Sequence, residues 1–284
     1  MDINLAIAAR ARAGEPLTAA EIEELAATDV LSLGMLADEV RRARVGDHVT
    51  FVRVHELQPD EEAVPEAAGE IRLSTLPATL DDAVAAVRRG RGLAVTRLLT
   101  GFSLADLVDR GNGEWGNLPA VLEALKAAGL DAIAEAPLDR LDNAREALDA
   151  AVKAGLPVRC LTLQQPVGDE RAAALINIRS LASRMPKATV APLPREQSVA
   201  VPTTGYDDVR MVALARLALP GVPNIQVDWA QYGPKLAQVA LMFGANDVDR
   251  VSCVDDDSLG HRRTAVADVT RNIAAAGFTP VERR

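Results

Sequence analysis

Segments typical of β-strands and of α-helices alternate along most of this 284-residue chain. Eight short runs have the alternation and the buried-type residues of strands: residues 48–54, 70–74, 93–98, 132–135, 157–163, 189–193, 224–229 and 250–254. Helical patterns rich in Ala and Leu separate most of them: residues 80–89, 119–128, 143–154, 170–184, 207–218 and 234–243. This order favours a parallel sheet closed on itself. We therefore predict an α/β fold, a (β/α)8 TIM-type barrel.

The regions that flank the first strand predict the domain organisation. Residues 1–47 carry helical patterns only, so we predict an N-terminal helical extension packed on a (β/α) barrel of residues 48–284 with a C-terminal helix. The first crossover is shortened, because residues 55–69 form an acidic, Pro-containing linker with poor helical character. We expect the N-terminal helices to cover the resulting gap, with a dimer interface as the competing interpretation.

Composition restricts the classes of partner. The formal net charge is -9 and the pI is near 5.0, so the chain repels a phosphate backbone on average, which argues against nucleic acid. Neither a run of roughly 20 apolar residues nor a secretory signal is found, so we expect a cytoplasmic protein with no membrane partner. Two cysteines exclude a disulfide framework.

The most specific motif lies between Asn224 and Asp247, where a strand, a turn at Gly233-Pro234 and a helix end in a polar loop. Ile225-Gln226, Trp229, Gly233-Pro234-Lys235 and Gly244-Ala245-Asn246-Asp247 resemble one radical S-adenosylmethionine (SAM) group. That group contains aminofutalosine synthase, the cyclic dehypoxanthinyl futalosine synthase and the second subunit of deazaflavin cofactor synthase. Residues 93–107, 122–133 and 144–161 are also similar to it. The resemblance implies a radical SAM-type barrel, and the first two members serve menaquinone synthesis by the futalosine route.

The chain lacks the motif that radical chemistry requires. A radical SAM enzyme holds a four-iron cluster with three thiolates of one CxxxCxxC loop, and leaves one iron open to SAM. Here only Cys160 and Cys253 are present, far apart in apolar runs, so we interpret them as buried structural thiols. The resemblance places the missing loop between the first two strands, where residues 55–69 now lie.

Other loops that would hold SAM or substrate in the group are also changed. The expected glycine pair after the second strand is Ser74-Thr75, and the expected "GGGAE" reads Glu135-Ala136-Pro137-Leu138-Asp139. Side chains at these positions close the space that glycines leave for a ligand. We therefore expect no cofactor and no metal.

Candidate ligand-binding residues follow from the rule that functional groups of barrels lie at the carboxyl ends of strands, and from the resemblance. They are Arg97, Glu135, Gln164, Asp228, Gln231, Lys235, Asn246 and Asp247. A buried Asp228 needs a cation, and we consider Lys235 and Arg97 as partners in a structural ion pair or beside a ligand. Asn246 and Asp247 have a second interpretation, in which they organise their loop through local hydrogen bonds.

Two further constellations have ordinary interpretations that we prefer. Asp255-Asp256-Asp257 with His261 has the residue types of a metal site, but consecutive acids point in different directions, so we interpret it as a solvated or helix-capping loop. His55 with Glu56 has the residue types of a general base beside a carboxylate. A surface histidine beside an acidic linker explains that pair as well.

Two functions remain open from the sequence. The first is a cluster-less radical SAM homologue associated with menaquinone biosynthesis, which binds a polar small molecule or a partner and is not a radical enzyme. That partner is a second copy of the chain or an active family paralogue docked at the first crossover. The alternative is an enzyme with cluster-independent acid/base chemistry on a futalosine-like or other polar metabolite. It requires Glu135, Asp228, Arg97 and Gln164 to converge, and no catalytic residue is assigned.

Overall fold

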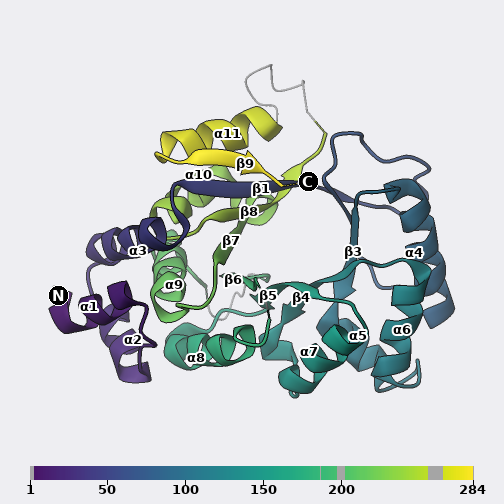
Figure 1. Ribbon diagram of the computed structural model, residues 1–284, viewed down its shortest axis with the longest axis horizontal. Coiled ribbons are helices and arrows are strands. Elements are labelled where there is room, and N and C mark those ends of the chain that lie inside the picture. The colour runs from purple at the N-terminus through teal and green to yellow at the C-terminus, as the bar shows by residue number, and fades with distance from the viewer. Residues whose placement is uncertain (1–2, 186, 197–201, 255–264, 284) are drawn as a thin grey trace.

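Eight parallel strands close into a barrel in the computed structural model, which describes residues 3–185, 187–196, 202–254 and 265–283. The strands are β1 (His48–Glu56), β2 (Glu70–Leu73), β3 (Leu98–Ser103), β4 (Ala132–Pro137), β5 (Val158–Leu163), β6 (Thr189–Pro194), β7 (Asn224–Asp228) and β8 (Asp247–Ser252). Each strand pairs with the next, and β8 pairs with β1, which closes the ring (Figure 1). The predicted TIM-type barrel is confirmed.

Helices surround the barrel and connect its strands. They are α4 (Leu80–Ala94), α5 (Leu104–Gly111), α6 (Leu118–Ala128), α7 (Ala144–Lys153), α8 (Arg171–Ala182), α9 (Gly205–Ala218), α10 (Trp229–Met242) and α11 (Ala265–Ala275). The predicted turn at Gly233-Pro234 is a break inside α10, where Gly233 has a φ of 75° that favours glycine. No helix of the described ranges is both long enough and apolar enough to cross a bilayer.

One strand was placed wrongly from the sequence. Residues 93–98 were predicted as the third strand, but α4 continues to Ala94 and β3 begins at Leu98. Ala94 packs into the core as the last residue of α4, so the apolar run before Arg97 belongs to the helix. The more deeply buried run, from Leu99 to Phe102, forms the strand.

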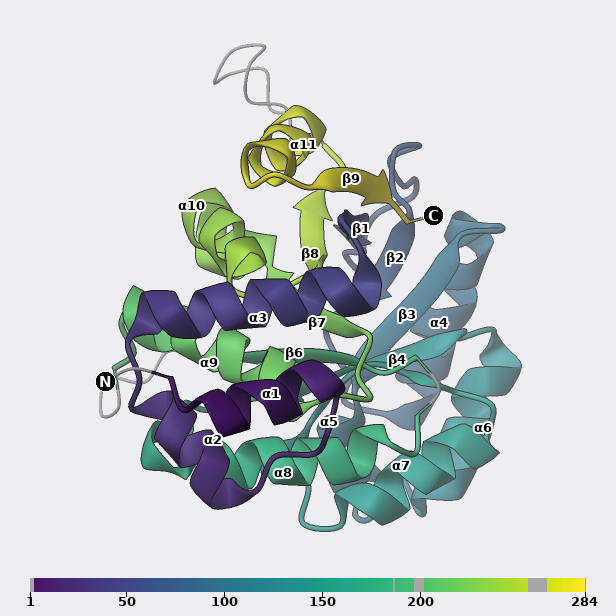
Figure 2. The same cartoon turned by 60° about the vertical axis from the view of Figure 1, so that its left-hand side comes forward.

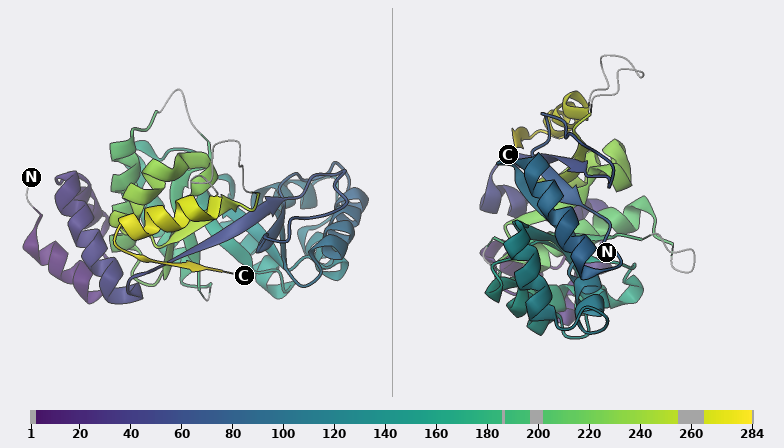
Figure 3. Two further views of the ribbon diagram at one scale, coloured as in Figure 1. Left: turned by 90° about the horizontal axis from the view of Figure 1, so that it is seen from above. Right: turned by 90° about the vertical axis from the view of Figure 1, so that its right-hand side faces the viewer.

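A ninth strand, β9 (Thr279–Glu282), fills the space that the shortened first crossover leaves beside β1. One edge of β1 pairs with β8, and the other edge is shared by two strands. His48–Phe51 pair with β9, and Val54–Glu56 pair with β2. Because β9 and β2 occupy successive parts of one edge, the barrel is closed there by two short strands, and β9 and β1 run side by side in Figure 3.

The N-terminal helices α1 (Leu5–Ala13), α2 (Ala19–Ala26) and α3 (Val30–Val45) pack on another side of the barrel (Figure 2). α2 contacts α8 and α9, and α3 contacts α9 and α10. Arg210 fixes this arrangement, because its Nη1 donates to the carbonyls of Ala26 and Thr28 at 2.6 and 2.8 Å. The expectation that these helices cover the first crossover is therefore wrong. β9 occupies that space, and Val49 and Phe51 of β1 are buried.

Candidate functional site

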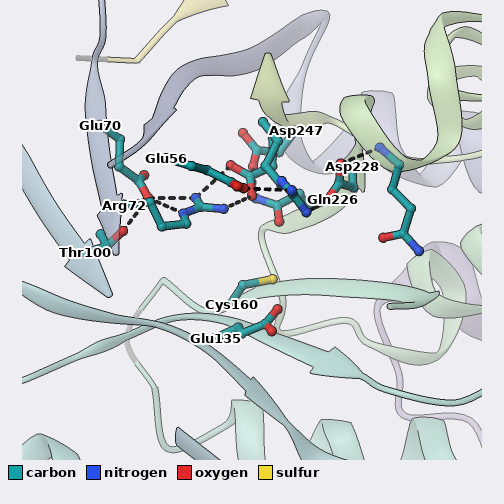
Figure 4. Close-up of polar contacts among 12 residues, drawn as sticks. Glu56, Glu70, Arg72, Thr100, Glu135, Cys160, Gln226, Asp228 and Asp247 are labelled. Atoms are coloured by element: carbon teal, nitrogen blue, oxygen red, sulfur yellow. Dashed lines mark hydrogen bonds and ion pairs between the residues drawn. The ribbon is translucent and has the colours of Figure 1, made fainter. Parts of the chain in front are cut away.

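Polar side chains fill much of the barrel interior, where TIM barrels usually carry branched apolar residues. Three strands contribute pairs two positions apart: Glu70 and Arg72 from β2, Gln226 and Asp228 from β7, and Asp247 and Asp249 from β8. Because residues i and i+2 of a strand face the same side, each pair points into the barrel together. Figure 4 shows Glu70, Arg72, Gln226, Asp228 and Asp247. A buried charge needs a partner, so the charged members form ion pairs, and Gln226 donates a hydrogen bond to Asp247.

The first ion-pair cluster is centred on Arg72. Its guanidinium contacts Glu70 Oε1 at 2.6 and 2.9 Å, and Asp249 at 2.9 and 3.1 Å. Thr100 Oγ1 donates to Glu70 Oε1 at 2.7 Å. Burial alone would raise the pKa of Asp249, but the charge and hydrogen bonds of Arg72 outweigh it and hold this pKa well below its usual range. The cluster is therefore ionised and fixed in geometry.

The second cluster is centred on Asp228 and lies nearer the carboxyl ends of the strands. Arg195, which follows β6, contacts Glu135 Oε2 through Nε at 2.9 Å and Asp228 Oδ2 through Nη1 at 3.0 Å. Arg250 of β8 reaches the same Asp228 oxygen at 3.4 Å and Glu56 at 2.7 Å. The partners expected for Asp228, Arg97 and Lys235, are therefore wrong. Two other arginines neutralise this buried carboxylate.

A cavity of about 240 Å³ opens at this end of the barrel. Its walls include Ser74, Ser103, Gln164 and Gln231 as well as residues of both clusters. In the two clusters five carboxylates, Glu56, Glu70, Glu135, Asp228 and Asp249, face three guanidiniums, Arg72, Arg195 and Arg250. The surroundings of the cavity therefore carry an excess of negative charge. The buried Ser103 hydroxyl has no hydrogen-bond partner within the described residues.

Gln164 and Gln231 fix the loops that form the mouth. The Gln164 backbone N–H donates to Asp139 Oδ1 at 2.7 Å, and its side-chain Nε2 donates to Glu196 at 2.5 Å. Gln231 Nε2 donates to the carbonyls of Pro194 and Arg195, both at 2.9 Å. These bonds hold the segment that carries Arg195. Asp228 Oδ1 in turn accepts from the Gln231 backbone N–H at 2.9 Å and caps α10.

Four of the predicted site residues thus lie at the mouth, and four lie elsewhere. Arg97 precedes β3 at the opposite end of the barrel, where its Nη2 reaches the Glu66 carbonyl at 3.4 Å. Lys235 is exposed on α10 and is not among the residues that line the cavity. Asn246 and Asp247 stand at the start of β8, also at the amino ends of the strands.

Asn246 and Asp247 have structural hydrogen bonds. Asn246 Oδ1 accepts from Arg216 Nη2 at 2.6 Å and from the Ile225 backbone N–H at 2.9 Å. Asp247 Oδ2 accepts from Gln226 Nε2 at 2.7 Å and from Arg283 Nη2 at 2.9 Å. These bonds organise the entry to β8. The second interpretation expected local bonds to the backbone, whereas these partners lie 21 to 36 residues away and three of the four are side chains.

Sequence reasoning missed Arg72, Asp249 and Arg250. The signal was the polar residue at every second position of β2 and β8, which an interior lined by charges requires. It was hidden because the eighth strand was predicted to begin at Arg250, three residues later than it does. Asp255-Asp256-Asp257 and His261 lie outside the described residues. Within the described ranges, no group of three or more His, Cys, Asp or Glu side chains is arranged to hold a metal ion.

The thiols do not fit a radical SAM cluster. Cys160 is buried on β5, and burial raises its pKa to about 12. Cys253 follows β8, and both thiols are free. With only these two cysteines in the sequence, the chain cannot supply the three thiolates that such a cluster takes from one loop.

Comparison with known proteins shows which family and which proteins the chain is similar to. Residues 187–284 match the family model of the CofH/MqnC C-terminal region. The chain is 26% identical over 270 residues to 5-amino-6-(D-ribitylamino)uracil–L-tyrosine 4-hydroxyphenyl transferase of Archaeoglobus fulgidus, which covers 75% of this chain and 79% of that protein. It is 39% identical over 88 residues to aminodeoxyfutalosine synthase of Thermus thermophilus, which covers 28% of this chain and 23% of that protein.

The chain is related to this radical SAM group. The chain is also 40% identical over 88 residues to 5-amino-6-(D-ribitylamino)uracil–L-tyrosine 4-hydroxyphenyl transferase 2 of Methanosarcina barkeri. Those residues span only 23% of that protein. The solved structure of methylornithine synthase matches with a TM-score of 0.70 at 16% identity, over 98% of both chains. The hydrogenase maturase HydG from Carboxydothermus hydrogenoformans matches with a TM-score of 0.65 at 14% identity, over 97% of this chain and 78% of that one. Both solved structures therefore have the same fold as this chain.

Proposed function

We propose that the chain is a cluster-independent relative of the menaquinone and deazaflavin radical SAM enzymes that binds a small polar metabolite at the mouth of its barrel. The observation that carries this proposal is the cavity, which is lined by four carboxylates, Glu56, Asp106, Glu135 and Asp249, and by three guanidiniums, Arg72, Arg195 and Arg250. The Ser103 hydroxyl in its wall has no hydrogen-bond partner within the described residues. An excess of buried negative charge favours a ligand that donates hydrogen bonds or carries an amino group.

The backbone of the cavity wall supports a binding role. Phe102 and Arg250 both line the cavity, and both have left-handed backbones, with φ of 63° and 55°. Non-glycine residues adopt this region at a cost, and they gather at ligand-binding sites where the surrounding structure imposes it. The two residues lie on β3 and β8, which approach the cavity from different sides.

The relatives indicate a ligand class. Their names specify an aminouracil that carries a ribitylamino chain, or an aminodeoxyfutalosine product. A ribityl chain presents several hydroxyl groups and an amine, which are the donors that carboxylate oxygens and amide oxygens accept. We therefore assign to the mouth a ligand that is rich in hydroxyl and amino groups, and we keep the association with menaquinone synthesis as part of the proposal.

The acid/base alternative is less favoured by the geometry. It required Glu135, Asp228, Arg97 and Gln164 to converge, but Arg97 lies at the other end of the barrel. Arg195 binds both Glu135 and Asp228, so both carboxylates already have a structural partner. A homo-oligomer, or a complex with an active paralogue, remains a proposal that no contact of this single chain supports.

Ligand binding is tested by the thermal stability of the full chain in the presence of 5-amino-6-(D-ribitylamino)uracil, with ribitol and uracil as separate probes. A bound ligand raises the Tm, and the shift grows with the logarithm of the ligand concentration once that concentration exceeds the Kd. We expect the shift for the intact probe to be lost in Glu135→Gln and Gln164→Ala. Lys235→Ala is the matched control, because Lys235 is exposed and off the cavity. A shift that survives both mouth variants contradicts the proposed site.

Cluster independence is tested separately by anaerobic reconstitution with iron and sulfide. The proposal requires that the protein binds no stoichiometric four-iron centre, because only two thiols are present. Four irons for each chain, with the absorption of an iron-sulfur cluster that is lost in Cys160→Ser, would overturn it. A positive control is an active enzyme of the same radical SAM group treated in parallel.

A further inference from the structure

Cys253, His55 and Glu61 form a separate group of reactive side chains outside the barrel mouth. Cys253 follows β8, His55 belongs to β1, and Glu61 lies in the linker between β1 and β2. Cys253 Sγ is 3.7 Å from His55 Nδ1, and His55 Nε2 is 2.9 Å from Glu61 Oε2. The neighbouring Glu56 points toward the mouth, where it contacts Arg250, so His55 faces the other way from the same strand.

This arrangement places a thiol, an imidazole and a carboxylate in the order that activated nucleophiles use. The carboxylate partner of His55 is therefore Glu61, and not the adjacent Glu56 that the sequence suggested. Each member has its neighbour within hydrogen-bonding distance, and each comes from a different segment. Proximity along the chain does not explain the contact between Cys253 and His55, which are 198 residues apart.

Glu61 is held in the ionised form that an orienting carboxylate needs. Its Oε2 accepts from the Gln58 backbone N–H at 2.8 Å, and this bond is the main reason that the pKa of Glu61 is lowered. Arg89 of α4 fixes the same turn, because its guanidinium donates to the carbonyls of Gln58 and Glu61, both at 2.8 Å. The shortened crossover thus presents a rigid carboxylate to the outer side of β1.

Cys253 differs from the other thiol of the chain in its neighbours. Burial raises the pKa of Cys253, so the thiol form predominates at neutral pH and a base must remove the proton. His55 Nδ1 is placed to do so. Within the part of the chain that the structure describes, Cys160 has no imidazole partner, and its Sγ donates to the Leu161 carbonyl at 3.5 Å. The chain therefore contains its own unassisted thiol for comparison.

The small exposed fraction of Cys253 limits the size of the reagents that can reach it. Only 9% of the residue is exposed, which excludes a bulky substrate and leaves small reagents to consider. Hydrogen peroxide is small, and it reacts with thiolates to give sulfenic acid. A histidine that takes the thiol proton and returns it to the leaving oxygen lowers the barrier of such a step.

We infer that Cys253 is a peroxide-reactive thiol, with His55 as its base and Glu61 as the residue that positions His55. His55 Nδ1 takes the proton of Cys253, and the thiolate attacks one oxygen of hydrogen peroxide. The S–O bond forms as the O–O bond breaks, and the leaving hydroxide takes the proton from His55 and departs as water. Sulfur is oxidised to sulfenic acid and peroxide is reduced. This site is independent of the proposed ligand at the barrel mouth.

The inference is tested on the full chain by trapping sulfenic acid with dimedone after hydrogen peroxide treatment at pH 7, and by measuring the label on each cysteine by peptide mass spectrometry. We expect Cys253 to be labelled at least about tenfold faster than Cys160. His55→Asn should lower the Cys253 rate by about tenfold or more and leave the Cys160 rate unchanged. Cys160→Ser is the matched control, and it should leave the Cys253 rate unchanged.

Glu61→Gln tests the positioning role through the pH profile of the Cys253 rate. A glutamine still occupies the site but carries no charge. The charge of Glu61 raises the pKa of the Cys253 thiol, so the rise of the rate with pH should move to lower pH. The rate at the plateau should fall, because His55 is a weaker base without the carboxylate. Arg53 and Glu61 are the charged groups whose fields act on the Cys253 thiol, and Arg89 faces Glu61. Equal labelling of the two cysteines in the unaltered chain would overturn the inference. So would an unchanged Cys253 rate in His55→Asn, with Cys160 still protected as evidence of folding.

Discussion

Arg195 connects two strands of the candidate site, because it binds Glu135 of β4 and Asp228 of β7 at once. The Asp228 side chain is 1% exposed, and Arg250, at 3.4 Å, is its one other cationic partner within the described residues. Without Arg195 it keeps that distant pair and the bond from the Gln231 N–H. We predict that Arg195→Met lowers the free energy of unfolding by about 3 kcal/mol, because removal of one partner strands a buried charge. Urea denaturation at pH 7 measures this loss.

Arg140→Met provides the matched comparison for Arg195. Arg140 also binds two carboxylates, Asp106 and Asp109, but its side chain and both partners are well exposed to solvent. Exposed pairs contribute little, so we expect a change of less than about 1 kcal/mol. Similar losses in the two variants would show that burial does not control the strength of the Arg195 pairs.

Asp249 gives the protein a specific dependence on acid. Its pKa in the folded state lies well below its usual range, because Arg72 outweighs the effect of burial. A depressed pKa stabilises the fold at pH values above the unfolded pKa of about 3.9, and this contribution is lost as the pH falls below that value. We predict that the difference in unfolding free energy between the unaltered chain and Asp249→Asn shrinks progressively from pH 5 to pH 2.5 or so.

Urea denaturation over this pH series measures that difference, and Asp109→Asn is the control. Asp109 is exposed and binds the exposed Arg140, so its substitution should give a small difference at every pH. A difference for Asp249→Asn that is constant with pH would mean that the fold does not lower the pKa of Asp249.

At the scale of elements, we expect the substitution of glycine by alanine to have opposite effects on stability at two helical positions. Gly34 lies inside α3, and a Cβ there would stand 2.6 Å from the Phe243 ring, so α3 approaches the end of α10 only because this side chain is absent. Gly92 lies inside α4 with open space around its Cβ position. We predict that Gly34→Ala destabilises the protein by about 1–3 kcal/mol through overpacking.

Gly92→Ala should instead stabilise it by about 0.5–1 kcal/mol, because alanine favours the helix and meets no neighbour. Thermal or urea unfolding of the two variants checks the pair. A stabilising Gly34→Ala would show that α3 and Phe243 separate easily. That outcome would remove the packing reason for this glycine.

The elements also show what the sequence could predict. Strands bounded by turn residues, such as β5 and β6, were placed to within a residue, because alternation and flanking polar residues mark their ends. β3 was placed five residues too early, since the apolar run at the end of α4 is as strong as the one that enters the barrel. α5 was missed because it follows β3 directly, and its apolar residues continue the same run.

The candidate site depends on these boundaries. Glu135, Gln164, Asp228 and Gln231 were identified because they follow well-placed strands. Arg97 was assigned to the mouth only because β3 was predicted too early in the sequence. Asp249 and Arg250 were missed because β8 was predicted to start too late. The cluster of Cys253, His55 and Glu61 was beyond the reach of the sequence, since its members come together only when β1 and β8 pair.

At the scale of the whole molecule, closure of the barrel depends on a segment far from β1 in the chain. β2 pairs only with the last three residues of β1, and β9 supplies the partner for the first four. The Thr279 and Arg283 amides donate to the carbonyls of Asp47 and Phe51, at 2.9 and 2.8 Å. An unpaired parallel edge would leave such carbonyls unsatisfied, so β9 replaces the pairing that a full-length first crossover would allow.

The ring of Phe278 anchors β9 to α3. It lies between the guanidiniums of Arg41 and Arg42, at 3.9 and 4.4 Å from the ring centroid. Arg41 is fully buried, and its two terminal nitrogens have no hydrogen-bond partner within the described residues. Burial lowers the pKa of Arg41. Its Nε binds Asp38 at 3.3 Å, and the ring face is a second favourable contact for this cation.

We predict that Phe278→Ala lowers the free energy of unfolding by about 3–5 kcal/mol, because it leaves both a cavity and an uncovered buried cation. Hydrogen exchange at the Thr279 and Arg283 amides should quicken beyond the global change, because β9 then detaches from β1 before the barrel unfolds. Phe278→Leu is the matched control, since it keeps most of the volume and loses only the ring, at a cost of about 1 kcal/mol. In the unaltered chain and in both variants, these two amides could instead exchange only through global unfolding. That result would mean that β9 does not detach separately from the barrel, and that its backbone pairing holds it and the Phe278 ring does not.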